Sequence, residues 1–342
     1  MLRSVLFLLM VCLSSAPALA TETLRVLAWP GYADRDLVRV FEIRHDVTVE
    51  VTFIGDDDEL WQRASANDGA NFDVMAVNTA ELRRYLDKSL LQPVRVKNIP
   101  NTRNQLPRFR ELHAVPGLQH KGEPYGIPFT YGAMGLIYNR QLVKQTPTSM
   151  NALWDPRWKG KVLAYSGSSH NFSFTALTMG VKNPFQLTHN QFVEVVHRLS
   201  RLRDNAQLFY SRPEEVVDSF RNKEVALVFA NYGEQQVQLL RRAGADVGYV
   251  IPKEGALAWL DVWTVLRGAR DRNLAEAWIN HMLSSGVSGA LTERQGFANT
   301  LTSMSGPGHD KDKLVWLEPV EDVTKRAQLW ERIMSVAPRP PR

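Results

Sequence analysis

Trp259 and Asp261 are the two residues whose types and spacing best suggest a binding chemistry. They lie two positions apart in the apolar segment 257–266, which is expected to be extended, and side chains two apart on a strand point to the same face. An indole beside a carboxylate suits a protonated amine, because the carboxylate supplies a counter-charge and the ring face attracts a cation. The other interpretation is that Trp259 belongs to the core and Asp261 is a surface charge.

A second polar segment, Ser166-Gly167-Ser168-Ser169-His170, follows the expected strand 162–165 and precedes a helix expected from about Asn171. Backbone N–H groups at a helix N-terminus, together with serine hydroxyls, can bind an anion. His170 can add a proton or a hydrogen bond. The other interpretation is that these residues only cap the helix and bind nothing.

Alternating strand and helix patterns surround both segments. Residues 24–77 are predicted to alternate strand, helix, strand, helix and strand, and the same alternation returns in residues 161–251. This order is typical of a parallel sheet with helices on both faces, whose ligands lie at the carboxyl ends of the strands. Trp29 and Asn78 occupy such ends. The sequence therefore predicts two α/β units joined by two extended segments, 127–138 and 257–266.

The first 20 residues have the features of a secretion signal. Arg3 precedes an apolar run from Val5 to Leu13, and Ala18-Leu19-Ala20 offers the small-x-small pattern that signal peptidase recognises. The run is too short to span a bilayer, which needs about 20 residues. The sole cysteine, Cys12, lies within this segment. We therefore expect an exported chain without a disulfide or a cysteine nucleophile.

Composition and motif spacing argue against several other classes. Charged residues make up 23% of the chain and hydrophobic residues 44%, as in an ordinary globular protein, and the basic residues are scattered rather than gathered into a nucleic-acid-binding stripe. The acidic run Asp56–Glu59 lacks the spacing and the glycine of a calcium loop, so it is interpreted as a helix N-terminus. The dispersed histidines give no zinc motif, and no dinucleotide fingerprint appears. We expect no metal and no cofactor.

Five segments in a characteristic order carry a family resemblance. The most specific is LWDPRWKGK at 153–161, and the others lie at 27–32, 71–75, 126–135 and 252–261. Together they resemble the periplasmic spermidine/putrescine-binding proteins, which are type II solute-binding proteins of ABC importers. The resemblance implies an α/β, two-lobed periplasmic-binding-protein type II fold (Venus flytrap), in which two strands cross at the hinge and the solute is buried between the lobes.

The resemblance also implies an organisation and a role. After a signal peptide at 1–20, lobe 1 is expected at 21–130 plus about 257–305, and lobe 2 at 131–256 plus about 306–342. The expected role is that of a monomeric, non-catalytic periplasmic receptor recognised by an inner-membrane ABC permease with its ATPase, with no nucleic acid as partner. Two alternatives are a ligand sensor and an exported enzyme that uses Ser168 or Ser169 with His170, although adjacent residues rarely align for catalysis.

By the same resemblance a set of pocket residues can be named. Asn78 stands at a serine position, and Phe297 stands at a tyrosine position and so lacks the hydroxyl. Asn231 stands where the family has a tryptophan, so this aromatic wall is missing unless the neighbouring Tyr232 replaces it. The full set of expected ligand-binding residues is Trp29, Tyr32, Asn78, Ser166, Gly167, Ser168, His170, Asn231, Tyr232, Trp259, Asp261 and Phe297.

The largest departure from the family concerns two carboxylates that hold the distal amine, because this chain has Gly167 and His170 at those positions. A diamine would lose a counter-charge there, at a cost on the order of several kcal/mol, which exceeds an aromatic contact of about 0.5–2 kcal/mol. We expect a small amine of the putrescine or spermidine type. The alternative is a zwitterion, such as 4-aminobutyrate, 5-aminovalerate or an aminophosphonate, with its amine at Trp259 and Asp261 and its acidic end at Ser166–His170.

Overall fold

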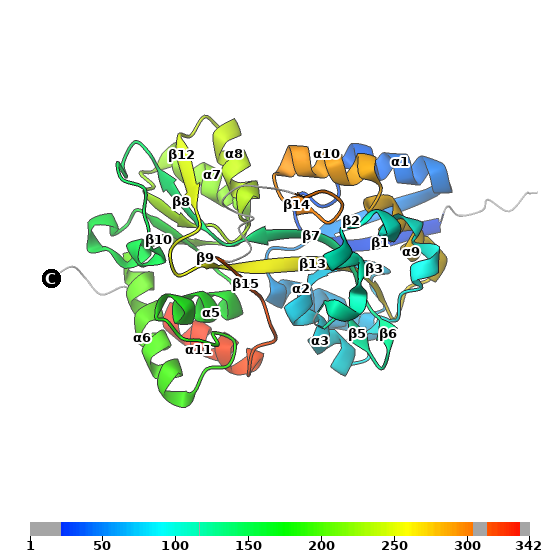
Figure 1. Ribbon diagram of the computed structural model, residues 1–342, viewed down its shortest axis with the longest axis horizontal. Coiled ribbons are helices and arrows are strands. Elements are labelled where there is room, and N and C mark those ends of the chain that lie inside the picture. Colours follow the sequence, from blue (N-terminus) through cyan, green and yellow to red (C-terminus); the bar gives the residue numbers. More distant parts are fainter. Residues whose placement is uncertain (1–21, 116, 304–312, 336–342) are drawn as a thin grey trace, which may run out of the picture.

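Two β-sheets, each covered by helices, organise the chain into two bodies that lie side by side (Figure 1). The computed structural model describes residues 22–115, 117–303 and 313–335. The expected signal peptide therefore lies outside the described residues. We call the body built on the eight-stranded sheet the first lobe and the body built on the five-stranded sheet the second lobe. This architecture confirms the predicted two-lobed α/β fold.

The sheet of the first lobe is mixed rather than purely parallel. Its order is β14-β7-β13-β3-β1-β2, and β4 and β15 also pair with β13. β1, β2 and β3 are parallel, as predicted, but β13 runs antiparallel to both β3 and β7 because the chain re-enters this sheet from the second lobe. The strands are β1 (Glu22–Ala28), β2 (Val47–Phe53), β3 (Val74–Asn78), β4 (Leu91–Gln92), β7 (Ile127–Ala133), β13 (Ala256–Leu266), β14 (Ala298–Asn299) and β15 (Leu314–Trp316).

β13 is the centre of the first lobe. All of its residues are buried, as expected for a strand that is covered on both faces. Trp263 on β13 packs edge-on against Trp278, with the ring centroids 5.9 Å apart. The helices of this lobe are α1 (Arg35–His45), α2 (Asp57–Ser65), α3 (Thr79–Asp87), α4 (Pro107–Arg110), α9 (Arg272–Met282) and α10 (Ser285–Gln295), and a small hairpin is formed by β5 (Gln119–His120) and β6 (Glu123–Pro124).

The sheet of the second lobe has the order β10-β9-β11-β8-β12. Its strands are β8 (Leu136–Asn139), β9 (Val162–Tyr165), β10 (Ala206–Tyr210), β11 (Leu227–Phe229) and β12 (Val247–Val250). Its helices are α5 (Ser168–Thr178), α6 (His189–Asn205), α7 (Pro213–Asn222), α8 (Glu234–Arg242) and α11 (Val323–Ser335). α5 begins three residues before the expected start, because Gly167 is its N-cap. Ser168 and His170 therefore lie in the first helical turn.

The chain passes between the two sheets in extended conformation. β7 ends at Ala133 in the first sheet and β8 begins at Leu136 in the second, and β12 and β13 are joined by a short segment in the same way. That these crossings act as a hinge, and that the lobes divide at the residue limits given above, stay predictions. Within the described ranges, none of the helices combines the length and hydropathy needed to cross a membrane.

Candidate ligand-binding site

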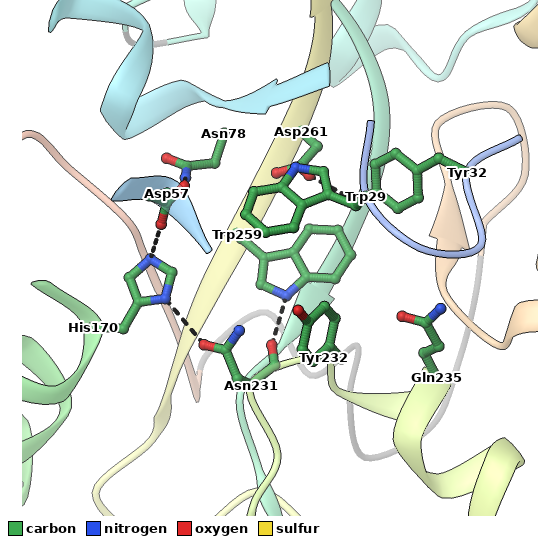
Figure 2. Close-up of a pocket in the computed structure, with 10 residues that line it drawn as sticks. All are labelled: Trp29, Tyr32, Asp57, Asn78, His170, Asn231, Tyr232, Gln235, Trp259 and Asp261. Carbon is green, nitrogen blue, oxygen red and sulfur yellow. Dashed lines mark hydrogen bonds and ion pairs between the residues drawn. The ribbon is translucent and has the colours of Figure 1, made fainter. Parts of the chain in front are cut away.

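A small cavity lies where the two lobes meet, and the space in it that atoms do not fill is about 380 Å³, part of which is open to solvent. The structure brings together most of the sequence-predicted site residues here and adds Asp57 and Gln235 to them. The lining residues, shown in Figure 2, are Trp29, Tyr32, Asp57, Asn78, His170, Asn231, Tyr232, Gln235, Trp259 and Asp261.

Asp261 is a buried carboxylate at this cavity. It lies on β13 directly opposite Asn78 of β3, and the residue is 4% exposed. Burial raises the pKa of Asp261 to about 7, and the hydrogen bond that the Tyr32 hydroxyl donates to it, 2.7 Å long, acts in the opposite direction. No ion pair joins it to a basic side chain in the part of the chain that the structure describes. The site therefore presents a carboxylate without a counter-charge.

Tyr32 is held in place by the turn after β1. Its backbone N–H donates to Trp29 O at 3.2 Å, and Gly31 within this turn has a φ of +84°, which favours glycine. The ring of Tyr32 packs edge-on against Phe129 and Phe297, at 5.4 and 5.2 Å. Phe297 therefore supports the ring of Tyr32; it does not line the main cavity but borders a small adjoining one with Tyr232 and Trp259.

Two indole rings, those of Trp29 and Trp259, border the cavity beside Asp261 (Figure 2). The indole N–H of Trp259 donates to Asn231 O of the second lobe at 3.1 Å, which fixes the ring. Gly132 on the neighbouring strand β7 lies opposite Trp259, and a Cβ there would come 2.6 Å from Trp259 Cζ2. Glycine at 132 therefore leaves the space that the indole fills. The ring faces give the cavity walls that attract cations.

Asp57, the first residue of α2, is the main site residue that the sequence interpretation missed. Asn78 Nδ2 donates to Asp57 Oδ1 at 2.9 Å, and His170 Nε2 lies 3.4 Å from Asp57 Oδ2. Burial raises the pKa of Asp57 well above its ordinary value, and the nearby carboxylates of Glu81 and Asp261 raise it further. The acidic run does form a helix N-terminus, as predicted, with Asp56 accepting from Glu59 N at 2.8 Å. The run was the available signal for Asp57.

His170 links the two lobes at the Asp57 end of the cavity. Its Nδ1 lies 3.0 Å from Asn231 Oδ1, and its ring stacks on Tyr165 with centroids 5.8 Å apart. Burial lowers the pKa of His170 to about 4, so the imidazole is neutral at physiological pH. The hydrogen-bond network assigns the proton to Nδ1, which donates to Asn231 and leaves Nε2 as an acceptor facing Asp57. Burial therefore disfavours the charged form of both groups, raising the pKa of Asp57 and lowering that of His170.

The predicted segment Ser166–Ser168 lies beside the main cavity and does not line it. The Ser166 hydroxyl lies 3.0 Å from the Ser211 hydroxyl. Gly167 and Ser168 border a smaller neighbouring cavity of about 260 Å³ together with Asp57 and Asp58. Burial raises the pKa of Asp58, and the nearby Ser168 hydroxyl acts in the opposite direction. The start of α5, where the sequence predicted an anion site, thus faces carboxyl groups of α2 across this smaller cavity.

Hydrogen bonds between the lobes close the cavity. The Tyr232 hydroxyl lies 2.9 Å from Gly55 O in the first lobe and 2.6 Å from Ser211 O in the second. Gln235, which the sequence interpretation also missed, donates from Nε2 to Pro30 O at 3.0 Å. The structure therefore represents a closed form. Among the described residues, no group of three or more His, Cys, Asp or Glu side chains is placed to hold a metal ion.

Comparison with known proteins agrees with this geometry. The family described as bacterial extracellular solute-binding protein matches residues 36–314. The putrescine-binding periplasmic protein PotF of Escherichia coli is 24% identical over 303 residues, which cover 83% of this chain and 80% of that protein. A putative spermidine/putrescine ABC transporter structure from Listeria monocytogenes has a TM-score of 0.82 at 19% identity and covers 92% of this chain and 99% of its own. A structure described as a GABA receptor has a TM-score of 0.68 at 17% identity, with 92% and 97% covered. The chain belongs to the bacterial extracellular solute-binding protein family.

Proposed function

We propose that this protein is the solute-receiving component of an ABC importer and that it captures a small amine of the polyamine type. The observation that carries the proposal is Asp261, a buried carboxylate with no cationic partner among the described residues. It lies beside the indoles of Trp29 and Trp259 and accepts a hydrogen bond from Tyr32. A protonated amine is the ligand that supplies what this site lacks. The relative PotF is a putrescine-binding protein, which supports the same ligand class.

The energetics of the site favour an ammonium group. A buried carboxylate is unfavourable unless it is paired and hydrogen-bonded, so an ammonium that enters the cavity keeps Asp261 ionised and gains a counter-charge. Each indole face adds about 0.5–2 kcal/mol through cation–π attraction. A neutral or anionic solute would gain neither contribution.

Lobe closure is the proposed mechanism. Trp29 and Asp261 belong to the first lobe, whereas Asn231 and Tyr232 belong to the second, so a ligand in the cavity touches both. A ligand that contacts both lobes stabilises the closed form relative to the open one. The segment 1–20 is proposed to direct export to the periplasm and to be removed there. The closed monomer would then be recognised by the permease, which an ATPase drives.

Two other functions have weaker support. A zwitterionic ω-amino acid is favoured by the likeness to the GABA receptor structure, but the start of α5 already faces the α2 carboxylates. An exported enzyme would need a serine activated by His170. Instead His170 Nδ1 bonds to Asn231, and Nε2 faces Asp57. A sensor that presents the closed form to a membrane receptor would use the same site as an importer, and a neighbouring operon with permease and ATPase genes would favour import.

Isothermal titration with putrescine tests the proposal. Asp261→Asn keeps the size of the side chain and removes its charge, and we expect it to weaken putrescine binding by at least about 100-fold, because breaking a buried pair costs about 3–5 kcal/mol. Asp87→Asn is the control, since this aspartate is paired with Arg83 on the surface and its side chain is 54% exposed. Wild-type protein that binds no amine, or an Asp261→Asn variant with unchanged affinity, would overturn the proposal.

A further inference from the structure

We infer that Asp57 is a second ammonium-binding group, so that the cavity selects a compact dication over a monocation or a zwitterion. The inference rests on the proposed function, because it takes Asp261 as the group that holds the first ammonium. The two carboxylates come from different elements, Asp57 from α2 and Asp261 from β13. Neither the position of Asp57 in the acidic run nor the family resemblance assigns it a role in ligand binding.

The geometry places both carboxylates in one cavity. Asn78 lies opposite Asp261 across the β3–β13 pair, and its amide donates to Asp57 Oδ1 at 2.9 Å. Figure 2 shows the Asn78 side chain between the two aspartates. The Asp57 side chain is 15% exposed, so it retains a face toward the cavity. A short linear diamine that lies along the indole walls can therefore place one ammonium at each carboxylate.

Acidic side chains outnumber basic side chains around Asp57. Among the ten residues that line the cavity there is no lysine or arginine. Arg84 is a basic side chain close to Asp57; its guanidinium lies over the ring of Trp61, and its Nη1 is 3.7 Å from Glu81 Oε2. The groups that face Asp57 are Asp56 and Asp58 on its own helix, Asn78 at the end of β3, Glu81 and Arg84 on α3, Ser168 and His170 on α5, and Asp261 on β13. Acidic groups outnumber basic ones here, and burial raises the pKa of Asp57, Asp58 and Asp261. A ligand that carries more than one positive charge is favoured because its ammonium groups stabilise the ionised carboxylates.

His170 completes the second site as a neutral partner. Its Nδ1 is bound to Asn231 and its Nε2 faces Asp57 as an acceptor, so it can accept a hydrogen bond from the same ammonium that pairs with Asp57. A charged imidazole would repel that ammonium, and burial works against the charged form. The family's two carboxylates in the second lobe are replaced in this chain by Gly167 and His170. Asp57 of the first lobe supplies a carboxylate in their place, so a diamine keeps its second counter-charge.

A zwitterion would meet the wrong charge at this end. Its carboxylate would have to lie beside Asp57, and the start of α5 at Ser168, which could receive it, faces Asp57 and Asp58. Like charges in a buried site repel and raise the cost of binding. The acidic end of an ω-amino acid is thus disfavoured where the ammonium of a diamine is favoured.

Calorimetric titration with three ligands that differ mainly at one end tests the inference. Putrescine is a dication, N-acetylputrescine a monocation and 4-aminobutyrate a zwitterion. We expect wild-type protein to bind putrescine at least about 100-fold more tightly than either analogue. Asp57→Asn should lower putrescine affinity to about that of N-acetylputrescine and leave the affinity for N-acetylputrescine unchanged, whereas Asp87→Asn should behave as wild type.

The outcomes separate this inference from the function on which it rests. Binding of amines without preference for the dication, or an equal loss for all three ligands in Asp57→Asn, overturns the role of Asp57 and leaves the role of Asp261 intact. Tighter binding of 4-aminobutyrate than of putrescine also overturns it. Absence of any amine binding to wild-type protein overturns both. The wild-type comparison decides the ligand preference even if Asp57→Asn does not fold.

Discussion

Replacing Asp261 by asparagine should make the empty protein close more readily, although the same change removes amine binding. In the closed form the residue is 4% exposed, and burial raises its pKa from an ordinary 3.8 to about 7. In an open form the carboxyl would be hydrated and its pKa would lie near the ordinary value. At pH 8 the empty protein can therefore close only by burying an unpaired charge.

The size of this effect follows from the two pKa values. A rise from 3.8 to about 7 corresponds to about 4 kcal/mol at pH 8, because each pKa unit is worth about 1.4 kcal/mol. A carboxyl whose pKa is raised in the closed form favours that form at low pH, and the contribution is lost as pH rises through about 7. Taken alone, the Asp261 carboxyl should make closure of the empty protein up to about 100-fold more favourable at pH 5 than at pH 8. Asp57, whose pKa is also raised, acts in the same direction. His170 acts in the opposite direction, because burial lowers its pKa to about 4 and closure at pH 5 must then bury an imidazole that the open form would protonate.

Single-molecule energy transfer between the lobes measures this closure. The sole cysteine is Cys12 in the expected signal peptide, so two introduced cysteines provide the labelling sites. Ile43 on α1 is 69% exposed and Val193 on α6 is 59% exposed, and Ile43→Cys with Val193→Cys places one dye on each lobe. The closed fraction without ligand is then compared at pH 5 and pH 8 in wild type, in Asp261→Asn and in the control Asp87→Asn.

We expect Asp261→Asn to close more than wild type and the control at pH 8, and this difference should become smaller at pH 5, where the carboxyl of the wild type is protonated on closing. Because His170 and Asp57 are unchanged in the variant, the difference between the two proteins isolates the contribution of Asp261. If Asp261→Asn does not raise the closed fraction at pH 8, or if the difference is the same at both pH values, then the buried carboxyl does not oppose closure and the reasoning fails.

Two further substitutions test how the cavity is built. Gly132→Ala places a Cβ 2.6 Å from Trp259 Cζ2, so the indole must move. We expect the putrescine affinity, measured by calorimetry, to fall about tenfold because the ring face is displaced. An unchanged affinity would show that the position of the ring is not critical. Tyr232→Phe removes the hydroxyl that contacts Gly55 O and Ser211 O. A hydrogen bond is worth about 1 kcal/mol, so the affinity for putrescine should fall about fivefold. A substitution that lowers the melting temperature more without putrescine than with it would contradict a role of this hydroxyl in closure.

Local sequence patterns predicted the strand–helix order because burial periodicity and turn signals are local properties. The strand β10 was missed, since Ala206–Tyr210 follows α6 with no intervening turn residue and has no clear alternation. The start of α5 was placed too late because the serines before Asn171 were interpreted only as caps. The antiparallel direction of β13 depends on where the chain crosses between lobes, which no local pattern encodes.

The candidate site, like the fold, could be predicted from the sequence only in part. Asp261 could be predicted to share a strand face with Trp259, because strand periodicity fixes the direction of both side chains. Asp57 could not be singled out, since the acidic run predicts the helix N-terminus but not which carboxylate faces the other lobe. That depends on the packing of α2 against His170 of α5, a contact between residues far apart in the sequence.

The hydrogen bonds that join the lobes mostly end on main-chain carbonyls. Tyr232 reaches Gly55 O, Gln235 reaches Pro30 O, and Trp259 reaches Asn231 O. A carbonyl oxygen is present whatever side chain its residue carries. Closure of the two lobes can therefore be retained while the ligand preference is redesigned at Asp57 and its neighbours. This makes the protein suitable for conversion into a reporter of other cationic metabolites.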